Sequence, residues 1–550
     1  MISDTLVLDP KDNLAVALKD LPVGEKRDVL GQEVVLVEKI SQKHKFALVD
    51  FATGDLATMY GVVVGKATQP IAKGALISTH NLTHETSQYQ INAKEISWSP
   101  PDISKFESRT WKGYHRKDGQ VGTANHWLVI PLVFCENRNI NVLKETLLEQ
   151  LGYAVQRDFR FDISTLIEAY QRGASADELT TSTVIQTADQ IRQSRPFPNV
   201  DGIKFLNHDG GCGCTRQDSA TLCSLLAGYI THPNCAGATI LSLGCQNAQI
   251  ADLKSAIEKR SPGFDRSVLY YEQQGDWTER EFLEEAVKGT FAGLMDANKY
   301  KREPAPLSAL SLGLECGGSD GFSGLSANPA LGYTSDLLVA LGGKTLLAEF
   351  PELNGVEQEL IHRCKDQSAA EKFSNLMESY NARAHADGSG FENNPSPGNI
   401  RDGLITDAIK SAGAAKKGGT SPVVEVLDYA EPANKPGLSL LCTPGGDVES
   451  TTGLAGSGAN VIVFTTGLGT PTGNAVAPLL KMSTNTDLFN RMRDIIDINA
   501  GTIITGEDTI ETKGEELLEL IIKTASGEFT PAAVRLGQDD FIPWKRGISL

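Results

Sequence analysis

The sequence lacks the hydrophobic runs of a membrane protein, because no segment approaches about 18 uninterrupted apolar residues. Its first residues, Met1-Ile-Ser-Asp-Thr5, lack the basic and apolar regions of a signal peptide, so we expect a cytoplasmic protein that does not bind membranes. Nine cysteines in 550 residues are an odd and sparse set, which argues against a disulfide framework and indicates a reducing compartment.

The chain also lacks an excess of positive charge. A net charge of −18 argues against nucleic acid as a partner, since phosphate binding needs a basic surface. The charge leaves room for a small anionic substrate, because a pocket can be positive inside an acidic shell. The sequence does not decide the oligomeric state, and a homo-oligomer is compatible with these observations.

The N-terminal part, residues 1–98, is predicted to be a small β domain. Short runs rich in β-branched residues, at 34–40, 45–50 and 62–67, are separated by Gly, Asp and Pro. Residues 99–115 contain Ser, Pro and charged residues without periodicity, which indicates a linker. From the length of the chain we expect about three domains.

The rest of the chain is predicted to be a large α/β body of one or two domains. Buried strands that each end in a loop rich in polar residues are typical of an open sheet with ligands at its carboxyl edge. The irregular segment 381–401 indicates a boundary, with a central domain at 116–390 and a C-terminal domain at 391–550. A site loop inside one larger domain is an equal alternative. The strands are expected at 127–134, 238–243, 310–314 and 459–466.

Three segments of the central region concentrate imidazoles and thiols: His208-Asp-Gly-Gly-Cys-Gly-Cys-Thr215, His232-Pro-Asn234 and Gly244-Cys-Gln246. In an extended segment, residues i and i+2 project to the same side, so Cys212 and Cys214 can face one point. This arrangement favours a metal such as Fe(II), or an iron–sulfur cluster. The alternative is a set of small core cysteines between glycine turns.

Two further strands end in loops with charged groups. Phe134-Cys-Glu-Asn-Arg138 offers a guanidinium that can clamp a carboxylate, although it also suits the first turn of a helix. The segment 314–324 contains Glu315, Asp320 and four glycines, whose free N–H groups suit an anion. A glycine-rich turn without a ligand is the alternative.

Two other loops are polar but carry little charge, and a further group of candidate residues is basic. The segments 393–399 and 465–473 supply amides and hydroxyls that suit a polyhydroxylated ligand, or form ordinary turns. In the N-terminal domain, His44 and Lys45 stand at the start of one strand and His80 follows another, and these groups can act as base and acid on an anionic substrate. The alternative is a set of solvated strand ends.

In this order and over nearly the whole chain, these loops resemble the altronate dehydratase family, to which galactarate dehydratase and the sulfolactate lyases are related. Lys43-His-Lys45, Tyr60-Gly61 and Thr79-His-Asn81 resemble the SAF module, a β-clip, that precedes the catalytic part in this family. The chain departs from the family, which often has Arg, Glu and Cys at three of its positions. These positions are Ala124, Gln246 and Ala500.

The resemblance implies a hydro-lyase that removes water from a sugar acid. The expected reaction converts D-altronate to 2-dehydro-3-deoxy-D-gluconate in hexuronate catabolism. The alternatives are a galactarate-type diacid dehydratase, a sulfolactate lyase and, from another class, a non-catalytic sugar-acid sensor. The expected cofactor is Fe(II), followed by Mn(II). An iron–sulfur cluster on Cys212, Cys214 and either Cys245 or Cys316 is a third choice.

Roles for individual residues follow from the resemblance. Catalytic proton transfer is assigned to a small domain that closes over the α/β body, through His44, Lys45 and His80. Substrate contacts are assigned to Arg138, Asn328, Asn394, Ser396, Asn399, Thr465 and Thr466. Metal ligation is assigned to His208, Cys212, His232, Glu315 and Asp320.

Overall fold

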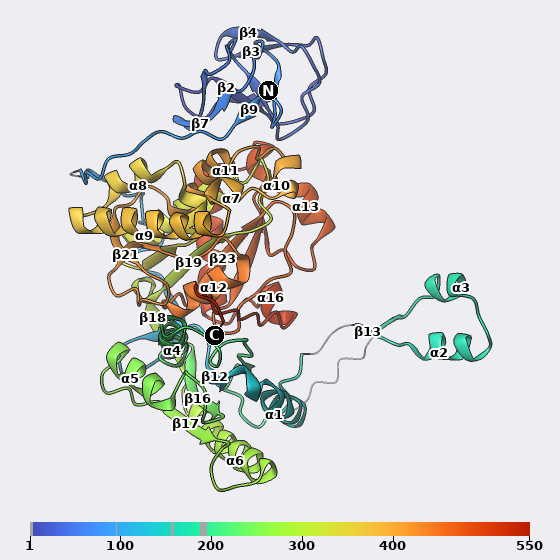
Figure 1. The fold of residues 1–550 in the computed structure, drawn as a ribbon, viewed down its shortest axis with the longest axis vertical. Coiled ribbons are helices and arrows are strands. Elements are labelled where there is room, and N and C mark those ends of the chain that lie inside the picture. The colour runs from blue at the N-terminus through green and yellow to red at the C-terminus, as the bar shows by residue number, and fades with distance from the viewer. Residues whose placement is uncertain (1–3, 95, 156–158, 188–194, 550) are drawn as a thin grey trace.

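The computed structural model describes residues 4–94, 96–155, 159–187 and 195–549. Three bodies follow one another along the long axis of the molecule, with the N-terminal body at one end (Figure 1). The C-terminal body lies in the middle, and the second body along the chain lies at the far end. The chain therefore passes along the middle body before it builds that body.

Short antiparallel strands build the N-terminal body, which confirms the predicted small β domain. They form a four-stranded sheet in the order β1-β2-β5-β8, a three-stranded sheet in the order β6-β7-β9, and a hairpin of β3 and β4. The strands stay short because Gly, Asp and Pro interrupt them. Their bounds are β1 (Thr5–Leu6), β2 (Leu14–Ala17), β3 (Lys26–Val29), β4 (Gln32–Val35), β5 (Lys45–Ala47), β6 (Leu56–Met59), β7 (Val62–Ala67), β8 (Leu76–Ile77) and β9 (Leu82–Thr83).

The N-terminal body shares a hydrophobic core with the middle body. Val16 and Ile77 of the β domain belong to the same cluster of buried side chains as Phe322, Leu404 and Ile409 of the middle body. Burial of apolar surface therefore fixes the small domain on the larger one. This contact brings the loop before β5 to the edge of the larger sheet.

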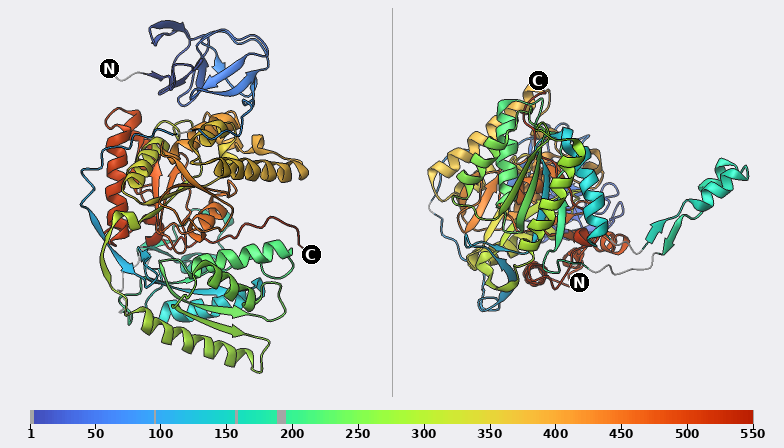
Figure 2. Two further views of the ribbon diagram at one scale, coloured as in Figure 1. Left: turned by 90° about the vertical axis from the view of Figure 1, so that its left-hand side faces the viewer. Right: turned by 90° about the horizontal axis from the view of Figure 1, so that it is seen from below.

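The connection between the first two bodies runs along the surface of the middle body (Figure 2). The predicted linker 99–115 is shorter in the structure, because its last six residues form β10 (Thr110–His115). This strand pairs with β11 (Val121–Gly122) and β18 (Arg302–Pro306) in a three-stranded sheet. Its side chains alternate between exposed and buried over most of its length, as expected for a strand with one face on a core.

The second body is a four-stranded parallel sheet in the order β15-β12-β16-β17. Helices α1 and α6 cover one face of this sheet and α4 and α5 cover the other. Every residue of β16 is buried, which explains its nearly continuous apolar sequence. The elements are β12 (His126–Pro131), β15 (Gly202–Phe205), β16 (Cys235–Ser242), β17 (Ser267–Glu272), α1 (Asn137–Gln150), α4 (Arg216–Ile230), α5 (Ile250–Arg260) and α6 (Glu279–Ala297).

An arm projects from the second body between α1 and β15 (Figure 1). It consists of a two-stranded antiparallel sheet and two short helices, and the right-hand view in Figure 2 shows these helices away from the other bodies. Its elements are β13 (Phe159–Phe161), α2 (Ser164–Gln171), α3 (Ala176–Thr180) and β14 (Ile185–Thr187).

The middle body is built on a seven-stranded sheet in the order β21-β22-β20-β19-β23-β24-β25, with every pairing parallel. The boundary predicted between residues 390 and 391 falls between β20 and β21, which belong to this one sheet. The strands are β19 (Ser311–Cys316), β20 (Lys344–Leu347), β21 (Val423–Leu427), β22 (Gly437–Leu441), β23 (Val461–Thr466), β24 (Leu479–Ser483) and β25 (Ile498–Asn499).

Helices pack on both faces of the seven-stranded sheet, with α7, α8, α9 and α15 in one core and α12 and α16 in the other. The α helices are α7 (Ala327–Ala340), α8 (Glu357–Arg363), α9 (Gln367–Ala386), α10 (Pro397–Arg401), α11 (Asp407–Ala414), α12 (Asp447–Gly456), α13 (Thr486–Arg491), α14 (Gly501–Ile504), α15 (Ile510–Ala525) and α16 (Ala532–Arg535). The 3-10 helices are η1 (Phe134–Glu136), η2 (Leu307–Ala309), η3 (Phe350–Leu353), η4 (Phe391–Asn393) and η5 (Ala415–Gly418).

The two parallel sheets are joined through α4 of one body and α12 of the other. Leu225 and Tyr229 of α4 lie in one buried cluster with Leu454 of α12 and Phe464 of β23. The second and middle bodies together thus have two parallel sheets and a continuous core, which confirms the predicted large α/β body. Among the described residues, no helix is both long and apolar enough to cross a membrane.

Candidate active site

The strand order of the larger sheet reverses between β19 and β23, since the chain adds β20 on one side of β19 and β23 on the other. Ligands of open α/β sheets bind outside the carboxyl ends of the strands at such a point. The loops after the two strands are joined there, because the Gly317 N–H donates to the Thr465 carbonyl at 3.1 Å. The Gly467 N–H donates to the Gly318 carbonyl at 3.0 Å. The predicted loops 314–324 and 465–473 are therefore neighbours.

Asp320 lies in the centre of these loops with its carboxylate fully buried. Its Oδ1 accepts hydrogen bonds from the hydroxyls of Ser323 at 3.1 Å and Thr484 at 2.9 Å. Its Oδ2 accepts from the Asn485 amide at 3.2 Å and pairs with the Lys43 ammonium at 2.9 Å. The last contact is an ion pair between the N-terminal body and the middle body.

Lys43 lies on the loop that precedes β5, in a left-handed backbone conformation with φ of 74°. Its Nζ also pairs with Asp402 at 3.1 Å. Burial opposes the charge of this ammonium, but the carboxylates of Asp320 and Asp402 outweigh burial and raise the pKa of Lys43. The side chain therefore stays a cation at the junction of the two bodies.

Lys45, two residues further along the chain, is the first residue of β5, and its side chain is buried, with 1% of the residue exposed. Its Nζ donates to the carbonyls of Gly403 at 2.6 Å and Lys43 at 3.0 Å. Burial lowers the pKa of Lys45 to about 7, and the Lys43 charge acts in the same direction against the opposing effect of Asp320. A neutral amine has two N–H donors and one lone pair, so the two carbonyls leave the lone pair free to accept a proton.

A cavity of about 420 Å³ opens beside these groups, which is enough for a six-carbon acid. Side chains of the N-terminal body and of the middle body line it together. The lining includes Lys43, Phe322, Asp402, Leu468, Asn485, Thr486, Asp487 and Arg491. Lys43 is paired with carboxylates, whereas Arg491 has no ion pair with a described residue. The cavity thus offers one uncommitted guanidinium.

A second cluster of charged groups begins at the same end of β19. The Lys417 ammonium pairs with Glu349 and donates to the Cys316 sulfur at 2.8 Å. The Cys316 thiol donates to Glu352 at 3.0 Å, and Lys410 pairs with Glu352 at 2.6 Å. All five side chains are buried.

This cluster holds more carboxylates than cations. Burial first, and then Glu352, raises the pKa of Glu349 to about 7, and the same two causes raise the pKa of Asp447 to about 6. Burial also raises the pKa of Glu315 well above its ordinary value, and one of its oxygens accepts from Ser450 at 2.7 Å. The cluster therefore retains protons near neutral pH that exposed carboxylates would lose.

The Cys316 sulfur, Glu349 and Glu352 lie within 4.8 Å of one another, the spacing of a metal site. Among the described residues they are the group of Cys, His, Asp and Glu with that spacing. The Lys417 ammonium already occupies this position and balances the negative charge. A cation would have to displace it, so the arrangement does not fit a metal.

The five predicted metal ligands do not come together. His208 and His232 use both ring nitrogens in hydrogen bonds to the backbone: Nε2 bonds to the carbonyls of Pro131 at 2.7 Å and Ala459 at 3.0 Å. Each Nδ1 accepts from an N–H two residues further on. Burial lowers the pKa of His208 to about 4 and that of His232 to about 3, so both rings are neutral and fully used.

The other three predicted ligands belong to different places. Glu315 lies in the charged cluster and Asp320 lies at the cavity. Cys212 lies in the second body, half-buried. The physical reason for the separation is that the predicted ligands follow strands of two different sheets.

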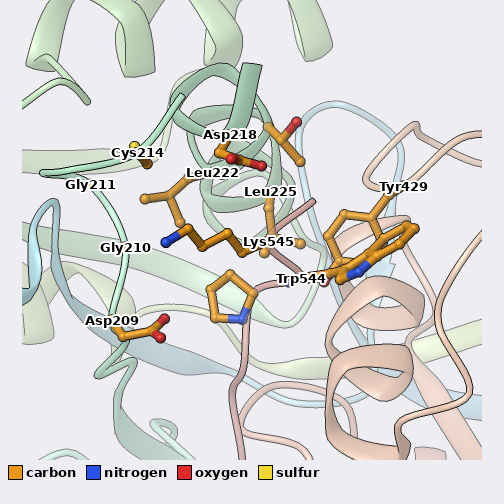
Figure 3. A pocket seen from close by; sticks show the side chains of 12 residues that line it. Asp209, Gly210, Gly211, Cys214, Asp218, Leu222, Leu225, Tyr429, Trp544 and Lys545 are labelled. Carbon is orange, nitrogen blue, oxygen red and sulfur yellow. Dashed lines mark hydrogen bonds between the residues drawn. The ribbon is translucent and has the colours of Figure 1, made fainter. Parts of the chain in front are cut away.

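A small pocket lies against the segment 209–214, between α4 and the C-terminal segment. Figure 3 shows the Lys545 side chain extending toward Gly210, with Trp544 and Tyr429 at the opposite side. The pocket is mostly apolar and has a volume of about 30 Å³, which is too small for a sugar acid.

The three predicted catalytic residues are placed differently. Lys45 does not line the cavity itself but is buried behind Lys43, to whose carbonyl its Nζ donates at 3.0 Å. His44 is half-buried, with Nδ1 at 3.1 Å from the Gln42 carbonyl. His80 is exposed at the turn between β8 and β9, where its N–H donates to the Ser78 hydroxyl at 3.3 Å. The roles of both histidines stay predictions.

Four of the predicted substrate residues hold the loops of the site in place. The Thr465 hydroxyl donates to the Asn328 amide oxygen at 2.6 Å, and the Thr466 hydroxyl accepts from the Gly469 N–H at 2.9 Å. The Asn399 amide donates to the Ser319 carbonyl at 2.7 Å. These bonds position the loops that carry Asp320 and Leu468, and direct contact with substrate stays a prediction.

The remaining three have separate surroundings. Asn394 accepts from Lys410 at 2.7 Å, while its buried Nδ2 has no partner among the described residues and can donate to a ligand. Ser396 caps α10. Arg138 is exposed on the second body, where it pairs with Glu279. The structure does not bring Arg138 to the cavity of the middle body.

The sequence-based prediction missed Lys43, Asp402, Arg491 and the acid–lysine cluster. Lys43 stands in the segment Lys43-His-Lys45, whose resemblance to the SAF module was the available signal. Asp402 and Arg491 lie in helix-terminal segments that carry no motif. Glu349 stands two residues after the end of the apolar strand β20, so its place after a strand was the available signal.

Comparison with known proteins finds matches for three successive parts of the chain. Residues 3–85 match the altronate/galactarate dehydratase SAF domain, residues 113–298 the second domain of D-galactarate dehydratase/altronate hydrolase, and residues 307–549 the D-galactarate/altronate dehydratase C-terminal domain. Altronate dehydratase of Bacillus subtilis is 32% identical over 94% of either chain. The chain belongs to this family.

Two further relatives of this altronate/galactarate dehydratase chain have related activities. Galactarate dehydratase (L-threo-forming) of Escherichia coli is 31% identical over 94% of this chain and 92% of its own. The (2R)-sulfolactate sulfo-lyase subunit beta of Chromohalobacter salexigens is 26% identical over 80% of this chain and 98% of its own. The family members are dehydratases and a lyase, and this chain is accordingly a hydro-lyase that acts on a sugar acid.

Proposed function

We propose that this enzyme dehydrates D-altronate to 2-dehydro-3-deoxy-D-gluconate, a step of hexuronate catabolism. The observation that carries the proposal is the cavity between the N-terminal and middle bodies, in which Arg491 is the cation without a carboxylate partner among the described residues. One guanidinium suits one substrate carboxylate, which it can bind through two parallel hydrogen bonds. Altronate has one carboxylate.

The alternatives within the family carry two anionic groups. Galactarate has two carboxylates, and sulfolactate has a carboxylate and a sulfonate. The second group would need another cation, since an unpaired charge in a closed site is costly. Lys43 is not available for that purpose because it is already paired with Asp320 and Asp402.

Proton transfer can be assigned to Lys43, which lines the cavity, and to Lys45, whose amine lies behind it at 3.0 Å from the Lys43 carbonyl. The neutral amine of Lys45 takes the proton from C2, next to the carboxylate, and negative charge develops on that carboxylate. The Lys43 ammonium, which lines the cavity, can protonate the departing 3-hydroxyl. The enol that results becomes the 2-keto acid without further help. The N-terminal body, which packs on this side of the middle body and lines the cavity, would limit the access of water to the intermediate.

Metal dependence is part of the proposal, with Fe(II) as the first choice and Mn(II) as the second. A divalent ion would act as a Lewis acid on the carboxylate and the 2-hydroxyl. The five predicted ligands do not fit a single ion, because they lie in separate places. The steps above therefore use only the side chains of the chain.

The test is turnover after anaerobic purification, with Fe(II) or Mn(II) added back. D-Altronate, D-galactarate and sulfolactate are supplied separately, and 2-keto acid and sulfite are measured. We expect keto acid from altronate alone. Faster turnover of galactarate, or sulfite from sulfolactate, would replace the substrate assignment. Stabilisation by ligand without product from any of the three would favour a sugar-acid sensor.

A further inference from the structure

The second body has a reversal point of its own. The chain adds β15 on one side of β12 and β16 on the other, so the carboxyl ends of these three strands form a second place where ligands bind in open sheets. Each of the three strands is followed by a loop with a cysteine. Cys135 follows β12, Cys212 follows β15 and Cys245 follows β16.

Backbone hydrogen bonds hold the three loops against one another. The Phe134 N–H donates to the Gly210 carbonyl at 3.0 Å, which joins the first loop to the second. The Asn247 N–H donates to the Gly211 carbonyl at 2.9 Å, which joins the third loop to the second. Gly211 has a φ of 95°, and a Cβ there would lie 2.3 Å from the Leu132 carbonyl oxygen. The close approach of these loops thus depends on glycine.

The three thiols differ from the other cysteines in their exposure. Cys135 and Cys245 are exposed and Cys212 is half-buried, while the remaining six cysteines are buried. Partial burial and the nearby sulfurs of Cys212 and Cys245 raise the pKa of the Cys135 thiol, so the three groups lie within electrostatic reach of one another. The Gln274 amide donates to the Cys245 sulfur at 3.3 Å, a contact that also occurs around cluster ligands.

The spacing of these sulfurs separates two kinds of occupant. Thiolates on a single ion, at about 2.3 Å from the metal, lie about 3.8 Å apart. The three sulfurs are not all within 4.8 Å of one another, since among the described residues only the group with Cys316 meets that limit. In a cubane cluster each thiolate binds a different iron, so the ligands are more widely spaced. The arrangement is therefore too wide for one ion bound by all three sulfurs, whereas a cluster accommodates sulfurs that lie further apart.

We propose that Cys135, Cys212 and Cys245 bind a [4Fe–4S] cluster at the carboxyl edge of the four-stranded sheet. Three protein thiolates serve three irons and leave the fourth iron without a cysteine from this group. Cys214 and Cys316, which the sequence also offered, are excluded from the set. Cys214 is buried, and Cys316 lies in the other sheet beside Lys417. This proposal does not depend on which sugar acid the enzyme uses.

The binding step is a ligand exchange without electron transfer. A preformed [4Fe–4S] cluster that carries four small thiolates as ligands transfers its iron–sulfur core to the protein. Three Fe–S bonds to the small thiolates break and three to the cysteine sulfurs form. The three protons of the cysteine thiols leave on the released small thiols, so charge and atoms balance.

The experiment adds this preformed cluster, with 2-mercaptoethanol as the small thiol, to the anaerobic full-length chain. Iron, acid-labile sulfide and visible absorption are measured after gel filtration. We expect about four irons and about four sulfides per chain. Cys135→Ser, Cys212→Ser and Cys245→Ser should each retain less than about a third of this iron, because one of three anchoring bonds is lost. The matched control, Cys214→Ser, should retain the full amount.

Melting temperatures of all variants are measured in parallel. Two of the three cysteines are exposed, so their replacement is not expected to unfold the chain. The proposal is overturned if the chain takes up no cluster, or if Cys214→Ser loses it while folded Cys135→Ser keeps it. Uptake of one Fe(II) without sulfide also overturns it. Cluster content is measured without substrate. The result therefore stays the same if the turnover assay shows that the enzyme does not act on D-altronate.

Discussion

Replacement of Lys45 by Met is expected to remove most of the turnover. The buried amine has a pKa of about 7, against an ordinary value of 10.5. At pH 7 about half of the molecules then carry the neutral amine, whereas about 0.03% would do so at the ordinary pKa. The surroundings of Lys45 therefore increase the fraction of competent base by about 10³-fold. Loss of a general base typically costs about 10²–10⁴-fold in rate.

The assay is kcat/KM for D-altronate between pH 5 and 9. The wild-type profile should rise through an apparent pKa of about 7, because protonation of Lys45 removes the base. Lys45→Met and Lys45→Arg should lose both this limb and about 10²–10⁴-fold in kcat/KM. Lys11→Met, which changes an exposed lysine of the same body, should match the wild type.

The role of Lys45 as base is refuted if the limb near pH 7 persists in Lys45→Met, or if kcat/KM falls less than about tenfold. Stability gives an independent reading of the same pKa. The unfolded chain binds the proton between pH 7 and 10.5 and the folded chain does not, so this group makes stability rise with pH in that window. The full rise is up to about 5 kcal/mol, and urea unfolding of Lys45→Met should lack it.

Three further predictions concern the middle body. Lys417→Met leaves Glu349 without its buried partner, so chemical denaturation should show a loss of about 3–5 kcal/mol. Arg491→Gln should raise KM for altronate about tenfold or more with little change in kcat, whereas Arg493→Gln, outside the cavity lining, should change neither. Burial raises the pKa of Glu357 from 4.5 to about 7, so the folded chain holds a proton that the unfolded chain releases. Stability should fall by up to about 3 kcal/mol as pH rises through that window, and urea unfolding of Glu357→Gln at both ends should lack this fall.

Much of the fold and part of the site could be predicted from local patterns. The β-branched runs of the N-terminal body and the apolar strands of the α/β body are signals of single elements. The placement of Asp320 and Cys212 in loops that follow strands, and of Thr465 at the end of a strand, follows from the same local reading. The family resemblance then supplied the reaction class, which the comparisons confirm.

The grouping of these residues could not be predicted in the same way. His208 looks like a ligand in sequence, but in the fold both of its nitrogens satisfy the backbone. Lys417 and Glu349 carry no motif, and they meet only because η5 packs against the end of β20. A contact between distant segments depends on strand order, which local periodicity does not encode.

The sequence by itself determined which loops carry chemistry, because a strand followed by glycine and polar residues is a local feature of the chain. The tertiary structure alone decided which of those loops meet. Two parallel sheets, each with its own reversal point, divide the candidates between a lysine–aspartate cavity and a set of three thiols. The physical reason is that burial sets both the partners and the pKa of a charged group, and burial exists only in the folded chain.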